Sequence, residues 1–187
     1  MIPAVILAAG ASRRLGRPKQ LVEFDGESLL RRSVRAARAG CAPVLVVLGS
    51  RAPEMEAHLA GLAVTIVPNP EWEEGMAASL RRGVAALPAG AEAVLFLVCD
   101  QPRVDGALVQ RLLETCRAHP GAVVTCAYGG GRGTPSIFPA RCFPALLALR
   151  GDRGARGMLH GEDVVVIPFP GGERDVDVPG DLPDRAT

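Results

Sequence analysis

The loop after the first apolar run of the chain carries the residue types that bind a polyphosphate. Gly10 and Gly16 let the backbone turn and present N–H groups, and Ser12 can donate a hydroxyl. Four cations share this loop: Arg13, Arg14, Arg17 and Lys19. The spacing fits neither G-x-x-x-x-G-K-S/T nor G-x-G-x-x-G, so those two phosphate-binding motifs are excluded. A solvated basic turn is the alternative, but the position after a buried strand favours an anion site.

Carboxylates stand at two places that suit a metal ion. Asp100 follows the apolar run 94–98, at the expected carboxyl end of a strand, where open α/β sheets bind ligands. Mg²⁺ takes oxygen ligands and keeps several waters, so one or two carboxylates suffice. Asp100 could instead cap the next helix, but Asp105 is better placed for that. Near the end of the chain, Asp175 and Asp177 would face the same way in an extended segment, although a solvated turn is nearly as good an interpretation.

The sequence gives little sign of histidine-based catalysis or of disulfide bonds. The three histidines lie outside any metal or triad motif, and the five cysteines are scattered with no C-x-x-C pair. Because 21 Lys and Arg balance 20 Asp and Glu, the net charge of +1 gives no field that would recruit nucleic acid or a membrane. The apolar run 2–9 is too short for a signal peptide or a membrane span. We therefore expect a soluble, cytoplasmic protein.

The elements that must position these residues alternate between strand and helix. Short apolar runs predict buried strands at 4–8, 44–48, 64–67, 93–98, 122–126 and 164–167. Helical spacing falls between them, at Leu30, Val34 and Ala37, at Met76, Leu80, Val84 and Leu87, and at Leu108, Leu112, Leu113 and Cys116. This alternation predicts a three-layer α/β fold with a mostly parallel, doubly wound sheet.

Length and composition predict one domain over residues 1–187. A chain of this length with 48% hydrophobic residues can bury a single core. Residues 1–128 form the expected nucleotide-binding part. The rhythm breaks after Gly129, where a Gly-rich turn, a strand at 136–138 and a short helix at 145–149 predict a small acceptor-side lobe over 129–187. A helix opening at Gly75 would leave N–H groups free to face an anion or a base.

Five blocks of sequence, in order along nearly the whole chain, match the motifs of a known family. The first is the string L-A-A-G-A-S-x-R-L-G-R-P-K. It resembles the signature L-A-A/G-G-x-S-x-R-M-G-x-x-K of the MobA-like nucleotidyltransferases, and especially of the molybdenum cofactor cytidylyltransferases. The other blocks are N-P-E-W-E-E-G-M-A-A-S-L, G-G-R-G-T-P, G-D-R-G-A-R and D-V-D-V-P-G-D-L. Thr134 replaces the usual histidine of the third block, and Val178 and Gly180 depart from the usual ending.

The resemblance implies a set of site residues. Those implied for the nucleotide are Leu7, Ala8, Ala9, Gly10, Ser12, Lys19, Asn69, Gly75, Met76 and Ser79. Arg14 and Lys19 would bind the triphosphate and, with Asp100, form the catalytic set. Asp100 and Asp177 would hold Mg²⁺, with Asp175 as a weaker candidate. On the acceptor side, the implied residues are Arg132, Gly133, Thr134 and Arg153.

The reaction implied by the resemblance is transfer of CMP from CTP to a phosphorylated acceptor, molybdopterin, with release of pyrophosphate. Transient contact with a molybdoenzyme or its chaperone would follow. A phosphate acceptor is already anionic at neutral pH, so no histidine base is needed. The alternatives are GTP as donor, a sugar or polyol phosphate as acceptor, and a non-catalytic carrier of nucleotide or molybdenum cofactor. A dinucleotide-dependent oxidoreductase is disfavoured because its glycine fingerprint is absent.

Overall fold

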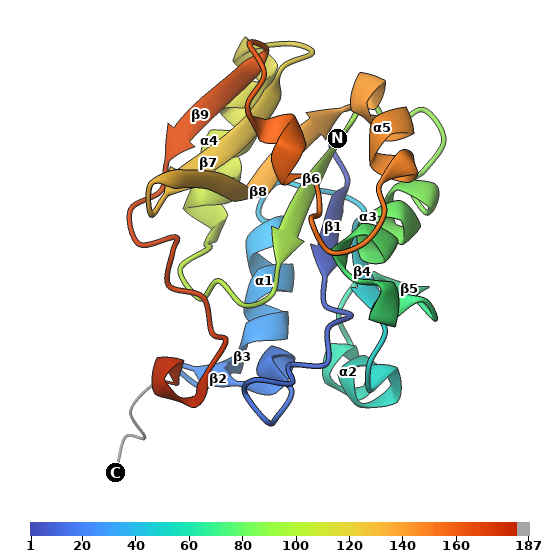
Figure 1. The fold of residues 1–187 in the computed structure, drawn as a ribbon, viewed down its shortest axis with the longest axis vertical. Coiled ribbons are helices and arrows are strands. Elements are labelled where there is room, and N and C mark those ends of the chain that lie inside the picture. The colour runs from blue at the N-terminus through green and yellow to red at the C-terminus, as the bar shows by residue number, and fades with distance from the viewer. Residues whose placement is uncertain (183–187) are drawn as a thin grey trace.

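Seven strands form one sheet in a computed structural model that describes residues 1–182 (Figure 1). The strands are β1 (Ala4–Leu7), β4 (Val44–Leu48), β5 (Thr65–Pro68), β6 (Ala93–Val98), β7 (Val123–Tyr128), β8 (Gly131–Pro139) and β9 (Val164–Pro168). Their order across the sheet is β5-β4-β1-β6-β8-β7-β9. Strand β8 runs antiparallel to β6 and β7, and the other neighbours in the sheet are parallel. The predicted mostly parallel sheet is confirmed.

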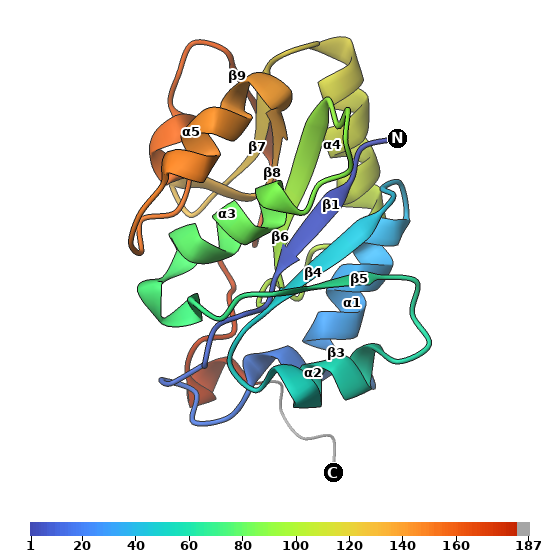
Figure 2. The same cartoon turned by 90° about the vertical axis from the view of Figure 1, so that its right-hand side faces the viewer.

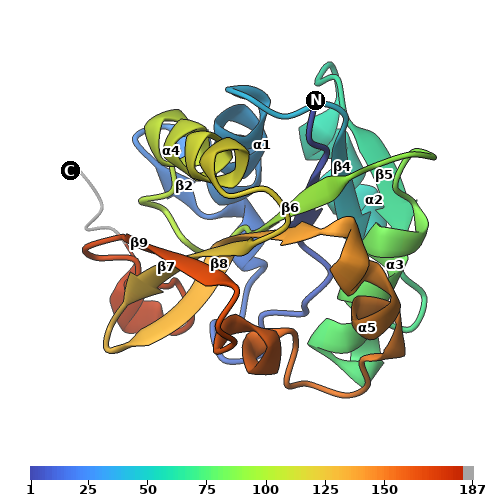
Figure 3. The ribbon, with the colours of Figure 1, turned by 90° about the horizontal axis from the view of Figure 1, so that it is seen from above.

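Helices cover both faces of this sheet, which gives three layers (Figure 3). They are α1 (Leu29–Arg38), α2 (Ala52–Leu59), α3 (Met76–Ala85), α4 (Gly106–Ala118) and α5 (Phe143–Ala148). Helices α1, α2 and α4 pack into one core, whereas α3 and α5 pack into the other. Figure 2 shows α3 and α5 side by side on their face of the sheet. Among the described residues, no helix is both long and apolar enough to cross a membrane.

The buried strands explain why the sequence shows continuous apolar runs rather than alternation. In β1, Ala4 and Ile6 belong to one core, and Val5 and Leu7 belong to the other. Because both faces of the strand are covered by helices, every position along it must be apolar. The helices in turn show one apolar stripe each, and α4 begins at the predicted cap, where Asp105 Oδ1 accepts a hydrogen bond from Leu108 N at 2.8 Å.

One helix and one hairpin were not predicted from the sequence, and one predicted strand was too short. Helix α2 is brief, with a proline in its first turn and few apolar positions, so its periodicity is weak. A small hairpin pairs β2 (Glu23–Phe24) with β3 (Glu27–Ser28). The strand expected at 136–138 is the longer, antiparallel β8. The last five residues of the expected domain, 183–187, lie outside the described residues.

The topology gathers distant segments at one edge of the sheet. Strands β1 and β6 are parallel neighbours with Leu7 opposite Val98, so the loop after Leu7 and the residues after Val98 emerge side by side. In Figure 1 both strands point toward the end of the molecule where this loop and the segment before residue 182 lie. Ligands of open α/β sheets bind at this edge.

Candidate active site at the carboxyl edge of the sheet

The loop after β1 is held in shape by one buried glutamine. Gln20, only 1% exposed, donates through Nε2 to Ala8 O at 3.0 Å and to Gly10 O at 2.8 Å. Its Oε1 accepts from Ser12 Oγ at 3.3 Å, and Ser12 Oγ accepts from Lys19 N at 3.0 Å. The hydroxyl of Ser12, expected to face a phosphate, therefore closes the loop on itself. This closure fixes the backbone from which the Lys19 side chain extends.

Lys19 lies at the centre of the site. Its Nζ donates to Asp100 Oδ2 and, at 3.0 Å, to Asp177 Oδ1. Asp177 Oδ2 accepts in turn from Arg14 Nη2 at 2.8 Å. Four of the residues named from the sequence thus form one chain of charges, although 163 positions separate Arg14 from Asp177.

The segment that carries Asp175 and Asp177 is docked by the residue between them. Val176 is 1% exposed in a small cluster with Leu15, Val22 and Leu29, and its N–H donates to Asp100 O at 2.9 Å. With Val176 turned into the protein, the expected alternation brings both aspartates near Asp100. Within residues 1–182, Asp100 Oδ1 and Asp175 Oδ1 are buried carboxylate oxygens without a hydrogen-bond partner.

Burial and the neighbouring charges shift the pKa values of these side chains. Burial alone would lower the pKa of Lys19, but the carboxylates of Asp100 and Asp177 outweigh burial and raise the pKa overall. Burial would raise the pKa of Asp177, but Lys19 and Arg14 lower it. Burial, followed by the charges of Asp100 and Asp177, raises the pKa of Asp175 to about 6. The site therefore holds a firmly charged lysine together with a carboxylate that ionises at a higher pH than an ordinary aspartate does.

Two cavities meet at Lys19 and Asp100. The smaller, about 450 Å³, lies between the loop after β1 and the start of α3, and Gly10, Trp72, Gly75 and Ser79 are among its lining. The larger, about 680 Å³, opens toward β8 and the segment after α5. Its walls are apolar near Phe96 and Phe138 and cationic where segment 153–157 covers it. Lys19 and Asp100 line both cavities, so two ligands could meet at these side chains.

The larger cavity also has a polar wall built on Gln101. This side chain, 4% exposed, donates to Tyr128 Oη at 3.1 Å and to Gly172 O at 3.0 Å. Its Oε1 accepts from Thr134 Oγ1 at 3.3 Å. Thr134, which replaces the histidine of the family motif it resembles, is thereby bonded to the residue that follows Asp100.

The start of α3 differs from the expectation of free N–H groups. Met76 N donates to Asp152 Oδ1 at 3.3 Å, and Ala77 N donates to Gly151 O at 3.0 Å. The prediction that this helix end offers an open anion site is therefore wrong for these two donors. The segment that occupies them lies some 75 positions further along the chain, which is why local sequence could not reveal it.

Residues 4–165 match the model of the MobA-like NTP transferase domain. The chain belongs to this family. Within the MobA-like family, it is 35% identical over 169 residues to nicotine blue oxidoreductase of Paenarthrobacter nicotinovorans, covering 85% of this chain and 81% of that protein. It is also 35% identical over 159 residues to a protein named "Probable molybdenum cofactor guanylyltransferase" from Opitutus terrae, covering 84% and 75%.

A solved structure of a MobA-like relative shows the same fold. Rv0371c of Mycobacterium tuberculosis is 33% identical, with a TM-score of 0.84 over 96% of this chain and 94% of that one. The same protein has been crystallised in complex with manganese, in a structure that is 29% identical with a TM-score of 0.81 over 96% and 95% of the two chains. These relatives confirm the family and the fold expected from the sequence, but they do not distinguish a cytidylyl from a guanylyl branch.

Most of the predicted site residues of this MobA-like chain line the two cavities. The exceptions are Ser12, Asn69 and Arg132. Asn69 is buried behind the smaller cavity and donates to Ser79 Oγ at 3.1 Å. Arg132 donates to Leu159 O at 2.8 Å and so supports the far end of the segment after α5.

Sequence reasoning missed the glutamines, Tyr128, Trp72 and Asp152. Trp72, the only tryptophan, had a weak signal, since it stands in the block before α3. Tyr128 is the last residue of β7, and its position at the carboxyl end of a strand was a signal of the kind that pointed to Asp100. The glutamines carry no charge or motif and gain a role only through the carbonyl groups that the fold brings to them.

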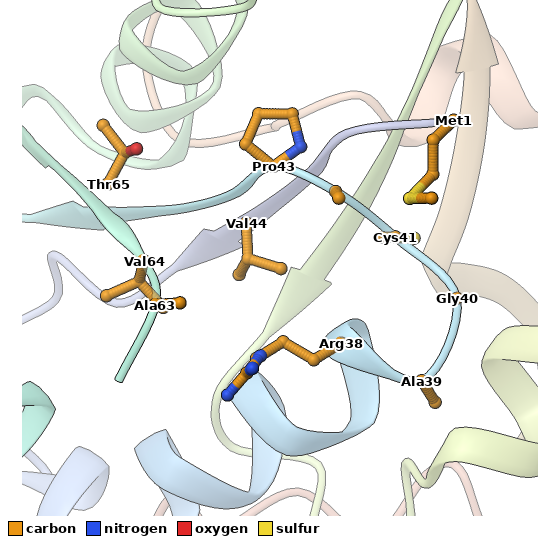
Figure 4. A pocket seen from close by; sticks show the side chains of 11 residues that line it. Met1, Arg38, Ala39, Gly40, Cys41, Pro43, Val44, Ala63, Val64 and Thr65 are labelled. Atoms are coloured by element: carbon orange, nitrogen blue, oxygen red, sulfur yellow. The ribbon is translucent and has the colours of Figure 1, made fainter. Parts of the chain in front are cut away.

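A third hollow lies at the opposite, amino-terminal edge of the sheet (Figure 4). It measures about 660 Å³, and most of the side chains that line it are short, with Arg38 as the one charged side chain among them. Its lining holds no carboxylate or histidine and only Cys41 as a thiol, whose pKa burial raises to about 12. This hollow is far from the charge chain around Lys19 and offers no comparable chemistry.

Proposed function

We propose that this MobA-like protein transfers a nucleoside monophosphate from a nucleoside triphosphate to a phosphorylated acceptor and releases pyrophosphate. The observation that carries the proposal is the position of Lys19 and Asp100 at the junction of the two cavities. A nucleotide in the smaller cavity and an acceptor in the larger one would bring their phosphates together at these side chains. Placing two reactants in line is a main source of rate acceleration in such transfers.

The transfer needs positioning and charge compensation more than proton transfer. An acceptor phosphate oxygen attacks the α-phosphorus, and the bond from that phosphorus to the β-phosphate oxygen breaks, so pyrophosphate leaves. The acceptor oxygen is anionic at neutral pH and requires no general base. Lys19, kept charged by its raised pKa, and Arg14 would compensate the charge of the leaving phosphates. Asp177 pairs with both cations and would hold them in place.

The carboxylates of the site also fit a divalent cation. The described residues contain no group of three or more His, Cys, Asp and Glu side chains that could hold a metal by themselves. Asp100 and Asp175, however, each present a buried carboxylate oxygen without a partner among residues 1–182. Mg²⁺ is commonly held by one or two carboxylates together with substrate oxygens. We propose that Asp100 is a ligand of Mg²⁺, with Asp177 or Asp175 as the second.

When bound, Mg²⁺ would supply Lewis-acid stabilisation of the phosphate charges. The two candidates for second ligand differ in their contacts. Asp177 pairs with Lys19 and Arg14, whereas Asp175 Oδ1 has no partner among the described residues. Substitution of each aspartate in turn therefore tests which one binds the metal ion. If Asp175 is the ligand, Asp175→Asn should raise the magnesium concentration needed for half-maximal turnover more than Asp177→Asn does. The reverse order would assign the role to Asp177.

CTP is the proposed donor and molybdopterin the proposed acceptor. The cytidylyl branch is supported by the L-A-A-G string at residues 7–10, and the guanylyltransferase relative keeps GTP as the alternative. The cations of segment 153–157 and the apolar wall of the larger cavity suit a phosphorylated acceptor with a ring system. A sugar or polyol phosphate is the alternative, because Thr134 departs from the usual histidine. With molybdopterin as acceptor, the product would pass to a molybdoenzyme or its chaperone.

A redox activity is the second candidate. It is favoured by one observation, the 35% identity to nicotine blue oxidoreductase over most of both chains. The sequence lacks the glycine fingerprint of a dinucleotide fold, and the charge chain of Lys19, Asp100 and Asp177 suits phosphate chemistry better. Oxidation of NADH or NADPH in the presence of nicotine blue would test this candidate directly.

The deciding experiment measures pyrophosphate release with Mg²⁺ and each of CTP, GTP, ATP and UTP, with and without molybdopterin. Release that requires both CTP and molybdopterin is the expected result. Release that requires molybdopterin and occurs with GTP but not with CTP would place the chain in the guanylyl branch. Nucleotide binding without release from any pair, followed by release with a sugar phosphate, would change the acceptor. Binding without any release would favour a carrier.

A further inference from the structure

The two cavities share a wall formed by Met76 and Asp152, which line both. Beyond Asp152, residues 153–157 line only the larger cavity. Before Met76, Trp72 and Gly75 line only the smaller one. The contact between Asp152 and Met76 is therefore where the proposed nucleotide side touches the proposed acceptor side.

The contact is a specific pair of hydrogen bonds rather than loose packing. Asp152 Oδ1 accepts from Met76 N at 3.3 Å, and Gly151 O accepts from Ala77 N at 3.0 Å. Gly75 allows this approach: a Cβ at that position would lie 2.5 Å from Asp152 Oδ1 and 3.0 Å from Gly151 O. The first turn of α3 thus receives the partners it needs from the segment after α5.

A second set of bonds holds the same segment just before Asp152. Arg81 Nη1 donates to Leu149 O at 2.9 Å and to Glu74 Oε1 at 2.8 Å. Gly151 N donates to Glu74 Oε1 at 3.4 Å. The chain is therefore fixed against α3 up to residue 152, after which it crosses the larger cavity.

The segment that crosses the larger cavity is also fixed at its other end, at Leu159. Leu159 is 3% exposed, and its carbonyl accepts from Arg132 Nη1 at 2.8 Å. Between the two anchors, Arg153 and Arg156 lie on the exposed segment that covers the cavity. The positions of these two arginines depend on where the segment starts to cross the cavity. That starting point is fixed by the hydrogen bond that Asp152 accepts from Met76 N.

We propose that Asp152 is a positioning residue for the acceptor, because its bond to the start of α3 holds Arg153 and Arg156 over the larger cavity. The proposal rests on the proposed function in taking that cavity as the acceptor site. Asp152 itself contributes an oxygen acceptor to a backbone N–H, and the cations that would meet an acceptor phosphate are its neighbours along the chain.

Kinetics test the role in the reaction. Asp152→Ala should raise KM for the phosphorylated acceptor about tenfold, the effect of one lost hydrogen bond to a charged group, while kcat changes less. Asp152→Asn, which keeps the oxygen acceptor, should restore KM. Because Asp152 also lines the smaller cavity, the test is one of degree: the rise in acceptor KM of Asp152→Ala should exceed any change in its nucleotide Kd, which the fluorescence of Trp72 reports. A matched control is Asp105→Ala, which removes an equivalent helix cap at α4, away from both cavities.

Trypsin cleavage tests the contact without any turnover. Both Arg153 and Arg156 are exposed, so faster cleavage after them reports release of the segment. Asp152→Ala should be cleaved faster than wild type, and Asp152→Asn and Asp105→Ala should not. Equal cleavage of Asp152→Ala and Asp105→Ala, or an equal rise in acceptor KM for the two, would overturn the proposal. Faster cleavage of Asp152→Ala with no pyrophosphate release by wild type would instead retain the contact and reject the proposed reaction.

Discussion

Lys19 is the only lysine in the chain, whereas every other basic side chain apart from the histidines is an arginine. Its side chain is 18% exposed and lies between two carboxylates that are 15% and 34% exposed. An ammonium is a compact point charge with three donors, and a guanidinium is a planar fork that needs more space. The site therefore uses the cation whose shape fits between Asp100 and Asp177, in a chain that otherwise uses arginine.

Substitution of Lys19 is the direct test of its role. Lys19→Ala should lower turnover by about a hundredfold or more, the scale of losing a preorganised charge-stabilising group, and Asp100→Ala should do the same. Lys19→Arg should not restore activity, because the guanidinium does not fit the ammonium position. Pyrophosphate release at saturating substrates measures the effect. Arg17→Ala is the control from the same loop, since Arg17 lines neither cavity. Wild-type turnover by Lys19→Ala would remove the assigned role.

Gln20 provides a second prediction at this scale. Gln20→Leu keeps the approximate volume but leaves Ala8 O and Gly10 O without their donor, and the buried Ala8 O alone should cost about 1 to 3 kcal/mol. The variant should unfold at lower urea concentration and bind nucleotide more weakly. Trp72 fluorescence on nucleotide titration reports the binding. Gln110→Leu is the control, because Gln110 bonds to Ala39 O on the exposed side of α4. Unchanged nucleotide binding by Gln20→Leu would show that the loop holds its shape unaided.

Sequence alone predicted several of the charged residues that line the two cavities, but it missed Asp152 and the uncharged side chains that support the others. Lys19 and Asp100 could be predicted because a cation in a glycine-rich loop and a carboxylate at a strand end have a chemistry of their own. Gln101 could not, since its partner Gly172 is 71 positions away and a glutamine has no preference that local sequence reveals. The same reason hid Gln20.

At the scale of elements, the segment before α3 is strengthened by an ion pair. Glu74 and Arg81 are joined by two contacts, at 2.8 and 2.5 Å. The hydrogen bond from Arg81 holds the pKa of Glu74 at about 2, below the ordinary 4.5. Because the folded-state pKa is lowered, the pair stabilises the protein above the unfolded pKa, and this stabilisation is lost as the pH falls from about 4.5 toward 2.

Glu74→Gln should therefore destabilise the protein at pH 7 and have a smaller effect as the pH approaches 3. Urea midpoints of wild type and variant at pH 7, 5, 4 and 3 measure the difference. The pair is partly exposed, so added salt should also reduce the effect at pH 7. A difference between the proteins that stays constant from pH 7 to pH 3 would mean that ionisation of Glu74 has no part in it.

The longer helices and the buried strands could be predicted because their periodicity is set by the core they face. Helix α2 and the β2–β3 hairpin could not be predicted from apolar periodicity, since they bury few side chains. The hairpin left a local signal, the pair Asp25-Gly26, both at positive φ (53° and 76°) as a tight hairpin turn requires. The partners of the first turn of α3 had no such signal, because Gly151 and Asp152 reach it through the tertiary fold.

At the scale of the whole molecule, the site depends on both ends of the chain meeting at one edge of the sheet. The loop after β1 supplies Lys19, the turn after β6 supplies Asp100, and the segment near residue 176 supplies Asp177. Val176 holds that last segment in place, packed against Leu15 and Leu29. The carboxylate that pairs with Lys19 and Arg14 is therefore delivered by a small apolar contact rather than by a strand of the sheet.

This dependence predicts that a methyl-scale change in the docking contact will affect catalysis. Val176→Ala removes two buried methyl groups, which should cost about 1.5 kcal/mol of stability. It should also loosen Asp177 and lower turnover per folded molecule, while nucleotide binding read from Trp72 changes little. Val178→Ala is the matched control, because Val178 lies two positions on and is 41% exposed. If Val176→Ala lost stability but kept full turnover per folded molecule, the ion pairs of Asp177 with Lys19 and Arg14 would be sufficient to dock the segment, and the apolar cluster would serve stability alone.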